Sequence, residues 1–466
     1  MWDVRRIAQK IGMDGAIAYS SSSRIIAGAA GVLTVFFIST FLTGIEQGFY
    51  FTFGSILALQ VFFELGLTGI MTQFVAHEVS HLSLKNNFEY EGEEVYKSRL
   101  ASLIHFCIKW YSVLAVISFV FLIVVGFIYF NRYGSNHTDV EWKLPWLLIC
   151  IGTAIKLFQS PFNSILMGLG MVKEMSKIGF WQQIIQPISI WIGLACGLKL
   201  YVVGIGYILS VLLWQLYVNE VGHTKIITNL WKVPITEKVS YLKEIFPFQW
   251  KIAISWISGF FIYHLFNPVL FATEGAVVAG QMGMTISVLS AVQNFSNSWV
   301  TTKVPLFSKL IALKEYKELD NVYNRTNKQM SLICLFLLLL VNLMLLFIRF
   351  IGLTWGGSPL AERLLPPIPM MLMSLAIFAN IWSSSWGIYL RSHKREPLLV
   401  FSVVIALLCT VSTLGLGKLY GLYGITIGYA VLMVGSLPWI YSIYINKRNN
   451  WHSNYEKNFN NRNTNL

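Results

Sequence analysis

Charged residues are scarce in this chain. They make up 12% of its 466 residues, whereas 55% are hydrophobic, and the mean hydropathy is +0.59. Soluble domains carry about a quarter charged residues, so this composition excludes an ordinary soluble domain. The net charge of +13 is not gathered on a solvated basic domain, which argues against nucleic-acid binding.

Cysteine pairs and catalytic motifs are also missing. No CxxC pair is present, and no Walker A or GxSxG motif occurs. We therefore expect no resident cofactor, no metal site, no disulfide and no ATP hydrolysis within this chain. The five cysteines all lie in apolar runs and are expected to be small packing residues: Cys107, Cys150, Cys196, Cys334 and Cys409.

Apolar runs long enough to cross a bilayer recur along the chain. A hydrocarbon layer of about 30 Å requires about 20 residues of helix. The most apolar run, Ser331–Ile348, contains no charged residue at all. We predict twelve such spans, at about residues 19–42, 49–74, 101–130, 144–167, 178–198, 201–218, 250–271, 278–300, 329–355, 366–390, 397–416 and 422–445.

The distribution of lysine and arginine tests this topology independently. If the twelve spans alternate in direction, 27 basic residues fall on the side that holds both termini and six fall on the other. Loops rich in Lys and Arg stay in the cytoplasm. The sequence therefore predicts a multi-pass membrane protein with both termini cytoplasmic.

A polar stretch near the middle divides the chain into two halves. We expect an amphipathic interfacial helix over 1–18, six-helix bundles over 19–221 and 249–445 with a cytoplasmic linker (222–248) between them, and a disordered cytoplasmic tail over 446–466. The halves show faint self-similarity, because TGIEQGF in the second span and TEGAVVAG in the eighth share a Thr-Gly/Glu start. Such internal repeats suit a transporter built from two related bundles.

Polar residues recur every three or four positions within several spans. On a helix this spacing places them on one face, which in a membrane turns away from lipid. We therefore expect several helices to line a hydrated central cavity. The rows are Ser98, Ser102, His105, Lys109 and Ser112; Thr153, Lys156, Gln159, Ser160 and Asn163; Ser290, Asn294, Asn297 and Thr301; and Asn380, Ser384, Gly387 and Arg391.

Three basic residues are candidates for binding an anionic cargo in that cavity. Lys156 lies near the middle of its span, where it either pairs with Glu64 or awaits an anionic ligand. Arg24 and Lys109 lie nearer the expected cytoplasmic ends, where reaching out to lipid headgroups is the alternative role. The amides expected to complete the binding surface are those of Gln159, Asn163, Asn294 and Asn297.

Glu64 is a carboxylate inside an apolar helix. A charge at that depth is costly enough to require a reason. Together with Gln60, one turn before it, Glu64 is a candidate for H⁺ or Na⁺ coupling. The alternatives are a pair with a nearby lysine or the capping of a neighbouring helix.

Two segments carry a resemblance to a known family. The second span ends with Glu64-Leu65-Gly66-Leu67, within FFELGLTGIMTQFVAHE, and the eighth is followed by VPLFSKLIALKEYKELDNVYNR, with Pro305, Ser308 and Leu310 in a P-x-x-S-x-L pattern. Together with twelve spans, these segments resemble the polysaccharide flippases of the multidrug/oligosaccharidyl-lipid/polysaccharide exporter superfamily. The lipid II flippases of the same superfamily typically have fourteen spans, for which this chain has no room.

The resemblance implies an all-α integral membrane protein, with two six-helix bundles arranged as a V around a central cavity. It implies translocation of an undecaprenyl-diphosphate-linked oligosaccharide to the outer leaflet for O-antigen, capsule or exopolysaccharide synthesis, by ion-coupled alternating access. The implied partners are that polyprenyl-diphosphate-linked oligosaccharide, membrane lipids and polysaccharide assembly proteins, with the chain acting as a monomer.

Two other functions stay open at this point. A multidrug or cation antiporter of the same superfamily would hold acidic groups in its cavity, whereas buried lysine here matches or exceeds buried glutamate. A polysaccharide polymerase or ligase would need a large outer loop, and the longest expected here is about 131–143.

Overall fold

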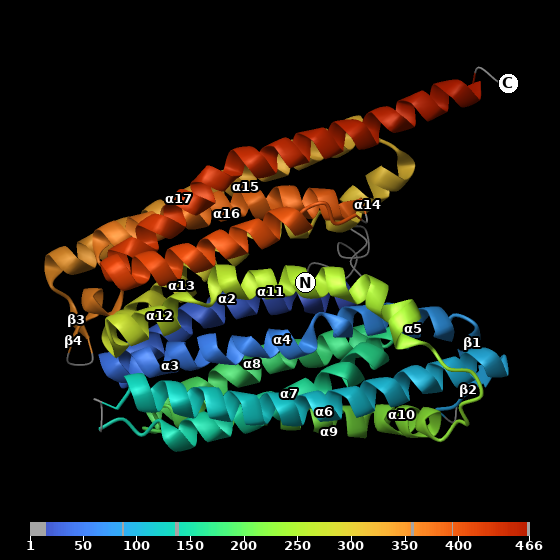
Figure 1. Ribbon diagram of the computed structural model, residues 1–466, viewed down its shortest axis with the longest axis horizontal. Coiled ribbons are helices and arrows are strands. Elements are labelled where there is room, and N and C mark those ends of the chain that lie inside the picture. Colours follow the sequence, from blue (N-terminus) through green and yellow to red (C-terminus); the bar gives the residue numbers. More distant parts are fainter. Residues whose placement is uncertain (1–14, 86–87, 136–138, 356–357, 394, 464–466) are drawn as a thin grey trace, which may run out of the picture. The chain divides into compact units, whose positions relative to one another are not determined.

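The structure is a computed structural model that describes residues 15–85, 88–135, 139–355, 358–393 and 395–463 (Figure 1). The chain separates into two compact units, unit 1 (Met1–Phe260) and unit 2 (Phe261–Leu466). The expected helix over 1–18 falls mostly outside the described residues. The boundary between the two units falls inside the seventh expected span, and residues 222–248 belong to unit 1. The domain boundaries expected at that linker stay a prediction.

Unit 1 is helical apart from one short antiparallel hairpin. Its elements are α2 (Gly15–Phe41), α3 (Gly44–Leu57), η1 (Ala58–Gln60), α4 (Val61–Glu64), α5 (Leu67–Val79), β1 (Leu82–Leu84), β2 (Tyr90–Gly92), α6 (Glu94–Tyr133), α7 (Lys143–Gly168), α8 (Val172–Ala195), α9 (Tyr201–Glu220), α10 (His223–Trp231), the π-helix η2 (Tyr241–Ile245) and most of α11 (Phe246–Tyr263).

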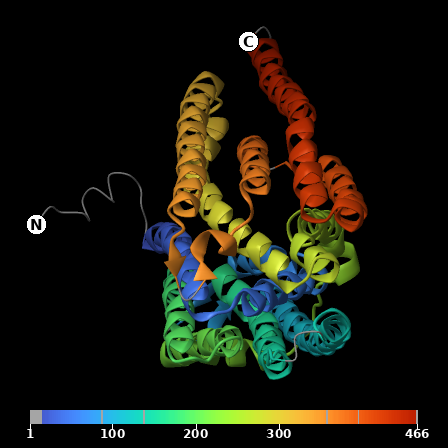
Figure 2. The same ribbon diagram turned by 90° about the vertical axis from the view of Figure 1, so that its left-hand side faces the viewer.

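Unit 2 has the same character, with a second small hairpin. Its elements are α12 (Phe266–Thr273), α13 (Ala276–Thr301), α14 (Val304–Leu313), α15 (Tyr316–Ile351), β3 (Thr354–Trp355), β4 (Ser358–Pro359), η3 (Leu360–Arg363), α16 (Pro367–Ser392) and α17 (Leu399–Asn463). In this unit α16 packs against both α15 and α17 (Figure 2).

The predicted all-α, twelve-helix architecture is confirmed. Among the described residues, eight helices are long and apolar enough to cross a membrane, and the bent pair Gly44–Glu64 and Leu67–Val79 makes a ninth. The helices α2 and α8 occupy two more expected spans. Gly421, with φ 54° and ψ −135°, interrupts α17 and so separates the last two.

The second span is not the single continuous helix that the sequence suggested. It breaks at Leu65 and Gly66, which adopt φ of 50° and 68°. A Cβ on Gly66 would lie 2.5 Å from Cγ2 of Ile252 on α11, so both the backbone angle and the close approach require glycine. The break leaves Glu64 at the end of a helix, where backbone carbonyl groups lack helical partners.

The self-similarity of the two halves recurs as a matching contact. Glu46, at the start of the second span, lies 2.9 Å from Lys199 in the connection between α8 and α9. That hydrogen bond raises the pKa of Lys199. In unit 2, Glu274 precedes α13 and accepts the Leu422 N–H at 2.7 Å, just after the break in α17. Each carboxylate therefore ties its helix to the turn between the fifth and sixth membrane spans of its own half.

The tail expected to be disordered continues α17 as a helix to Asn463. Its start is held by Asp320 of α15, whose Oδ2 lies 2.6 Å from Nη2 of Arg448 and whose Oδ1 accepts the Tyr389 hydroxyl at 2.7 Å. His452 stacks on Tyr316 with ring centroids 4.1 Å apart. The expectation of disorder is therefore wrong at the start of this segment, because partners on α15 and α16 offset the cost of ordering polar residues.

One arginine joins three elements of unit 1 at the end expected to be cytoplasmic. Arg99 of α6 contacts Glu78 of α5 at 3.1 Å and Glu244 of η2 at 2.8 Å. The Glu78 side chain is 2% exposed, so Arg99 neutralises a buried carboxylate. The hydrogen bond from Arg99 also holds the pKa of Glu244 below its usual value.

We expect Arg99→Gln to lower the free energy of unfolding by about 3–5 kcal/mol, because it strands the Glu78 carboxylate in the interior. The matched control is Arg391→Gln, which breaks a pair with Glu396 whose side chains are 49% and 37% exposed; its cost should be about 0–1 kcal/mol. Denaturant unfolding in detergent micelles, followed by tryptophan fluorescence, measures both. Equal losses would contradict the role given to Arg99.

Candidate functional site

Helices α7 and α9 meet along glycines. A Cβ on Gly204 would lie 2.7 Å from Cβ of Leu148, and one on Gly152 would lie 2.8 Å from Cβ of Tyr207. The backbones can approach this closely only because both positions lack side chains. One and two turns further along, Lys156 and Gln159 of α7 also face α9, where the Gln159 amide donates to the Val211 carbonyl oxygen at 3.3 Å.

Lys156 is held at this seam by an aromatic ring. Its Nζ lies 4.9 Å from the centroid of the Tyr207 ring, within the range of a cation–π interaction. Glu64 is close enough to interact with Lys156 electrostatically, but in the described part of the chain no carboxylate lies within 4.0 Å of this ammonium group. The ion pair considered from sequence therefore does not form here, and the charge of Lys156 is not neutralised by direct contact.

Glu64 lies in a polar cluster at the helix break. Its Oε1 accepts a hydrogen bond from Thr68 at 2.8 Å, and its charge also interacts with Tyr111 of α6. Tyr111 is fully buried, and its hydroxyl, although near Ser160 of α7, has no partner in hydrogen-bonding geometry among the described residues. Gln60 is half-buried in η1, one turn before Glu64. A carboxylate, hydroxyls and the carbonyls of a broken helix are groups that can bind a proton or a hard cation.

The remaining candidates are spread over both units. Asn163 is half-buried, and its Nδ2 lies 3.9 Å from Sδ of Met167. In unit 2, Asn294 is exposed on α13, and Oδ1 of Asn297 is buried with no hydrogen-bond partner in the part of the chain that the structure describes. Arg24 belongs to α2, but its side chain lies outside the described residues. The binding roles of these residues stay predictions.

The polar row of α6 serves a different purpose from the one expected. The Ser98 Oγ accepts the N–H groups of Thr236 and Glu237, both at 2.8 Å. Ser102 accepts the Val239 N–H at 3.3 Å. These serines bind the linker, so the expectation that they line a cavity is wrong. A backbone segment packed against a helix needs hydrogen-bond acceptors for its N–H groups, just as a water-filled space needs polar side chains.

His105 belongs to the same contact. Its Nε2 donates to the Trp231 carbonyl oxygen at 2.8 Å, and the two rings stack with centroids 3.7 Å apart. Lys109, one turn further, is exposed, and its proposed contact with cargo stays a prediction.

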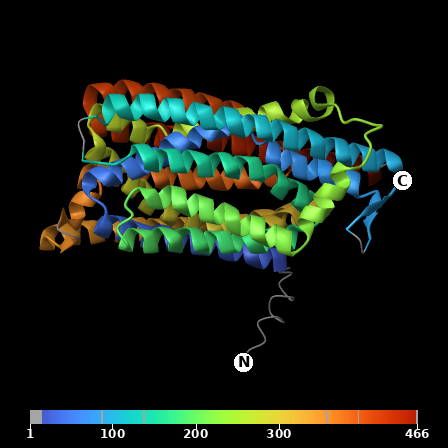
Figure 3. The ribbon, with the colours of Figure 1, turned by 90° about the horizontal axis from the view of Figure 1, so that it is seen from below.

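The bound segment, residues 231–245, is called the strap below. It advances two residues for each turn of α6, because Glu237 meets Ser98, Val239 meets Ser102 and Tyr241 stacks on Phe106 at 5.1 Å. A turn of helix rises about 6 Å over four residues and two residues of extended chain span about 6.6 Å, so the two repeats match. Figure 3 shows α10, which leads into the strap, at the same end of unit 1 as the β1–β2 hairpin, where Asn229 donates to the Phe88 carbonyl oxygen.

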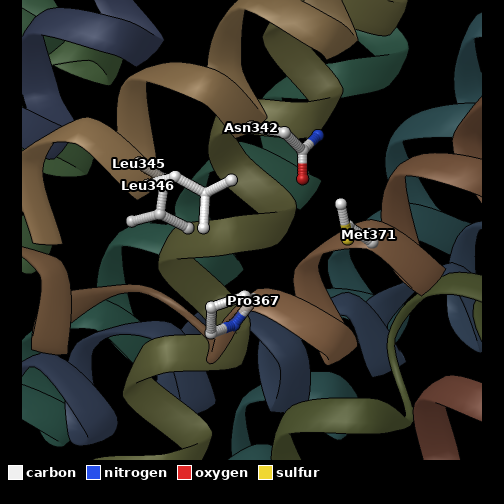
Figure 4. Close-up of a pocket in the computed structure, with 5 residues that line it drawn as sticks. All are labelled: Asn342, Leu345, Leu346, Pro367 and Met371. Carbon is white, nitrogen blue, oxygen red and sulfur yellow. The ribbon is translucent and has the colours of Figure 1, made fainter. Parts of the chain in front are cut away.

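A small pocket in unit 2 is lined mainly by apolar groups (Figure 4). Its volume is about 10 Å³, which is room for about one water molecule. Its one amide, Asn342, already donates to the Leu338 carbonyl oxygen and the Ser374 hydroxyl. This pocket is therefore too small for a cargo. Among the described residues, no group of three or more His, Cys, Asp or Glu could hold a metal ion.

Comparison with known proteins identifies the fold. No protein-family model and no curated protein matches the chain. Solved structures do match, at low identity. An inward-facing multidrug resistance MATE family transporter of the MOP superfamily has a TM-score of 0.61 and 12% identity, over 90% of this chain and 94% of that one.

Two further structures agree. The MATE multidrug transporter DinF-BH has a TM-score of 0.58 and 14% identity, over 93% of this chain and 94% of its own. The lipid II flippase MurJ, in an inward closed conformation, has a TM-score of 0.54 and 14% identity, over 92% and 87%. The chain therefore has the multi-pass, two-lobed membrane fold that these MATE and MurJ transporters share.

The strap makes a prediction for hydrogen exchange. In Ser98→Ala the amides of Thr236 and Glu237 lose their acceptor, so we expect peptides covering 234–241 to exchange roughly tenfold faster. Ser112→Ala is the matched control on α6, since that hydroxyl donates only to the Ile108 carbonyl oxygen of its own helix. Hydrogen–deuterium exchange with mass spectrometry measures both variants. Unchanged exchange in Ser98→Ala would show that the strap is not held by this serine.

Proposed function

We propose that this protein is a flippase that moves an undecaprenyl-diphosphate-linked oligosaccharide from the cytoplasmic to the outer leaflet of the bacterial inner membrane. The oligosaccharide would be a repeat unit for O-antigen, capsule or exopolysaccharide synthesis. Transport would proceed by ion-coupled alternating access. The MurJ likeness supports this proposal only at the level of fold, so the chemistry of the chain's own residues carries it.

The observation that carries the proposal is the state of Lys156. It lies within a membrane-spanning helix, yet it contacts an aromatic ring in place of a carboxylate. A charge at that depth is retained for a function in most membrane proteins. A diphosphate is the anionic part of the proposed cargo, and an ammonium group binds its oxygens through charge-assisted hydrogen bonds.

The other candidates complete a site of the same chemistry. Arg24 and Lys109 would meet the diphosphate nearer the cytoplasmic side. The amides of Asn163, Asn294 and Asn297 would bind sugar hydroxyls, and Gln159, whose amide nitrogen joins α7 to α9, keeps an oxygen for the same purpose. We further propose that the protein works as a monomer alongside membrane lipids and polysaccharide assembly proteins.

Glu64 is the natural place for coupling to an ion gradient. Within the described ranges it is the one carboxylate well inside a membrane span, since the others lie at the ends of spans or in connections. The broken helix and the partnerless Tyr111 hydroxyl leave oxygen atoms around it. H⁺ or Na⁺ binding at Glu64, with help from Gln60, would link the gradient to unit 1.

The central test uses Lys156→Ala in proteoliposomes with a fluorescent undecaprenyl-diphosphate oligosaccharide. We expect leaflet exchange to slow roughly tenfold or more, because a charge-assisted contact is lost. Lys177→Ala is the matched control, since Lys177 lies 5.7 Å from the Tyr217 ring at the expected cytoplasmic end; it should transport like the parent protein. Full exchange in Lys156→Ala would remove this lysine from the site.

The coupling role of Glu64 has its own test. In Glu64→Gln we expect transport to lose its response to an imposed H⁺ or Na⁺ gradient, because an amide neither takes up a proton nor supplies a negative ligand. Accumulation is measured with the gradient present and after an ionophore has collapsed it. A gradient response that persists in Glu64→Gln would exclude this residue as the coupling site.

A second candidate function is a multidrug or cation antiporter. The higher TM-scores of the two MATE structures favour it, whereas the unpaired lysine in unit 1 opposes a cationic cargo. Proteoliposomes that pump a cationic dye, but do not exchange the lipid-linked oligosaccharide, would select the antiporter. A polymerase or ligase is the weakest reading, since the outer connections are short and the fold is that of transporters.

A further inference from the structure

The Tyr207 ring is placed by an unusual contact between two helices. Gly152 lies one helical turn before Lys156 on the same face of α7, and Gly204 lies on the face of α9 that carries Tyr207. Because Gly152 has no side chain, Cβ of Tyr207 sits directly against the α7 backbone. The ring then reaches along α7 to the Lys156 ammonium, 4.9 Å from its centroid.

We propose that Tyr207 is a positioning residue for anion binding, a proposal that rests on the function assigned to Lys156. The ring fixes where the ammonium group lies without supplying a negative charge. A carboxylate in its place would hold the lysine equally well but would cancel the charge that the diphosphate must meet. The predicted ligand is a polyprenyl diphosphate, bound with the ammonium between its phosphate oxygens and the ring.

The physical advantage is a smaller cost of ordering. A free lysine side chain loses up to about 2 kcal/mol of rotamer freedom when it is fixed. The ring contact, of about 0.5–2 kcal/mol, fixes the side chain before ligand arrives. An anion bound on the far side of the ammonium does not compete with the ring for space, because the two contact opposite sides of the same positive group.

The test is the affinity of the protein in nanodiscs for undecaprenyl diphosphate. We expect Tyr207→Leu to raise Kd roughly three- to thirtyfold, which corresponds to the loss of the ring contact. Tyr207→Phe keeps the ring and should bind like the parent protein. Tyr217→Leu is the matched control, because it removes the ring beside Lys177 ten residues further along α9; its Kd should not change.

A second readout separates positioning from folding. We expect the rate at which acetic anhydride modifies Lys156, followed by mass spectrometry, to change in Tyr207→Leu and not in Tyr207→Phe or Tyr217→Leu. Gly152→Ala should act in the same direction as Tyr207→Leu, since its new Cβ would displace the tyrosine. If Tyr207→Leu fails to fold, Gly152→Ala and Tyr207→Phe still decide the question.

The outcomes also separate this inference from the function on which it rests. If Lys156→Ala abolishes binding while Tyr207→Leu and Gly152→Ala bind like the parent protein, the positioning role is overturned and the flippase stands. If Lys156→Ala binds undecaprenyl diphosphate normally, the proposed site itself is wrong. Equal losses in Tyr207→Phe and Tyr207→Leu would assign the effect to the hydroxyl, which overturns the positioning role of the ring.

Discussion

A positive charge on a membrane-spanning helix must find a partner inside the protein, because hydrocarbon offers none. Three described arginines near helix ends meet this constraint with carboxylates: Arg99 with Glu78, Arg391 with Glu396 and Arg448 with Asp320. Lys156 differs because it lies well inside its span and its partner there is a ring and not a carboxylate. That difference separates charges that hold the fold together from a charge that remains available to a ligand.

Glycine residues determine the position of the Lys156 ammonium group. Glycines on α7 and α9 bring two backbones together, and the same two helices then exchange a hydrogen bond through Gln159. Gly206, on another face of α9, approaches the Ile190 side chain of α8 in the same way. Gly204 and Gly206 therefore let α9 pack closely against α7 on one face and against α8 on another. The position of Tyr207 beside α7 is a consequence of this packing.

Hydropathy and the Lys/Arg asymmetry were sufficient to predict the all-α architecture and the number of spans. Hydropathy reports the cost of placing each residue in hydrocarbon, and the Lys/Arg bias reports which connections stay in the cytoplasm. The break at Leu65 and Gly66 was not predicted, because its glycine is required by Ile252 on a distant helix. A contact between residues so far apart in the chain leaves no signal in the local sequence pattern.

The site was predicted less completely than the fold, for a related reason. Lys156 and Glu64 stand out by charge alone. The α6 serines were assigned to the wrong neighbour, since a polar stripe on a helix binds backbone as well as water. Tyr207 was missed altogether, because tyrosine is ordinary in a membrane helix and its role appears only beside Gly152.

The strap has a practical consequence for dissecting this molecule. Read as sequence, residues 231–245 invite a cleavage site, an inserted tag or a junction for expressing the halves separately. The hydrogen bonds of Thr236, Glu237 and Val239 to α6 make this stretch part of the packing of the first half. Cutting or lengthening it would break the hydrogen bonds from its backbone to Ser98 and Ser102. A split version of the protein should therefore keep this stretch intact and be divided elsewhere.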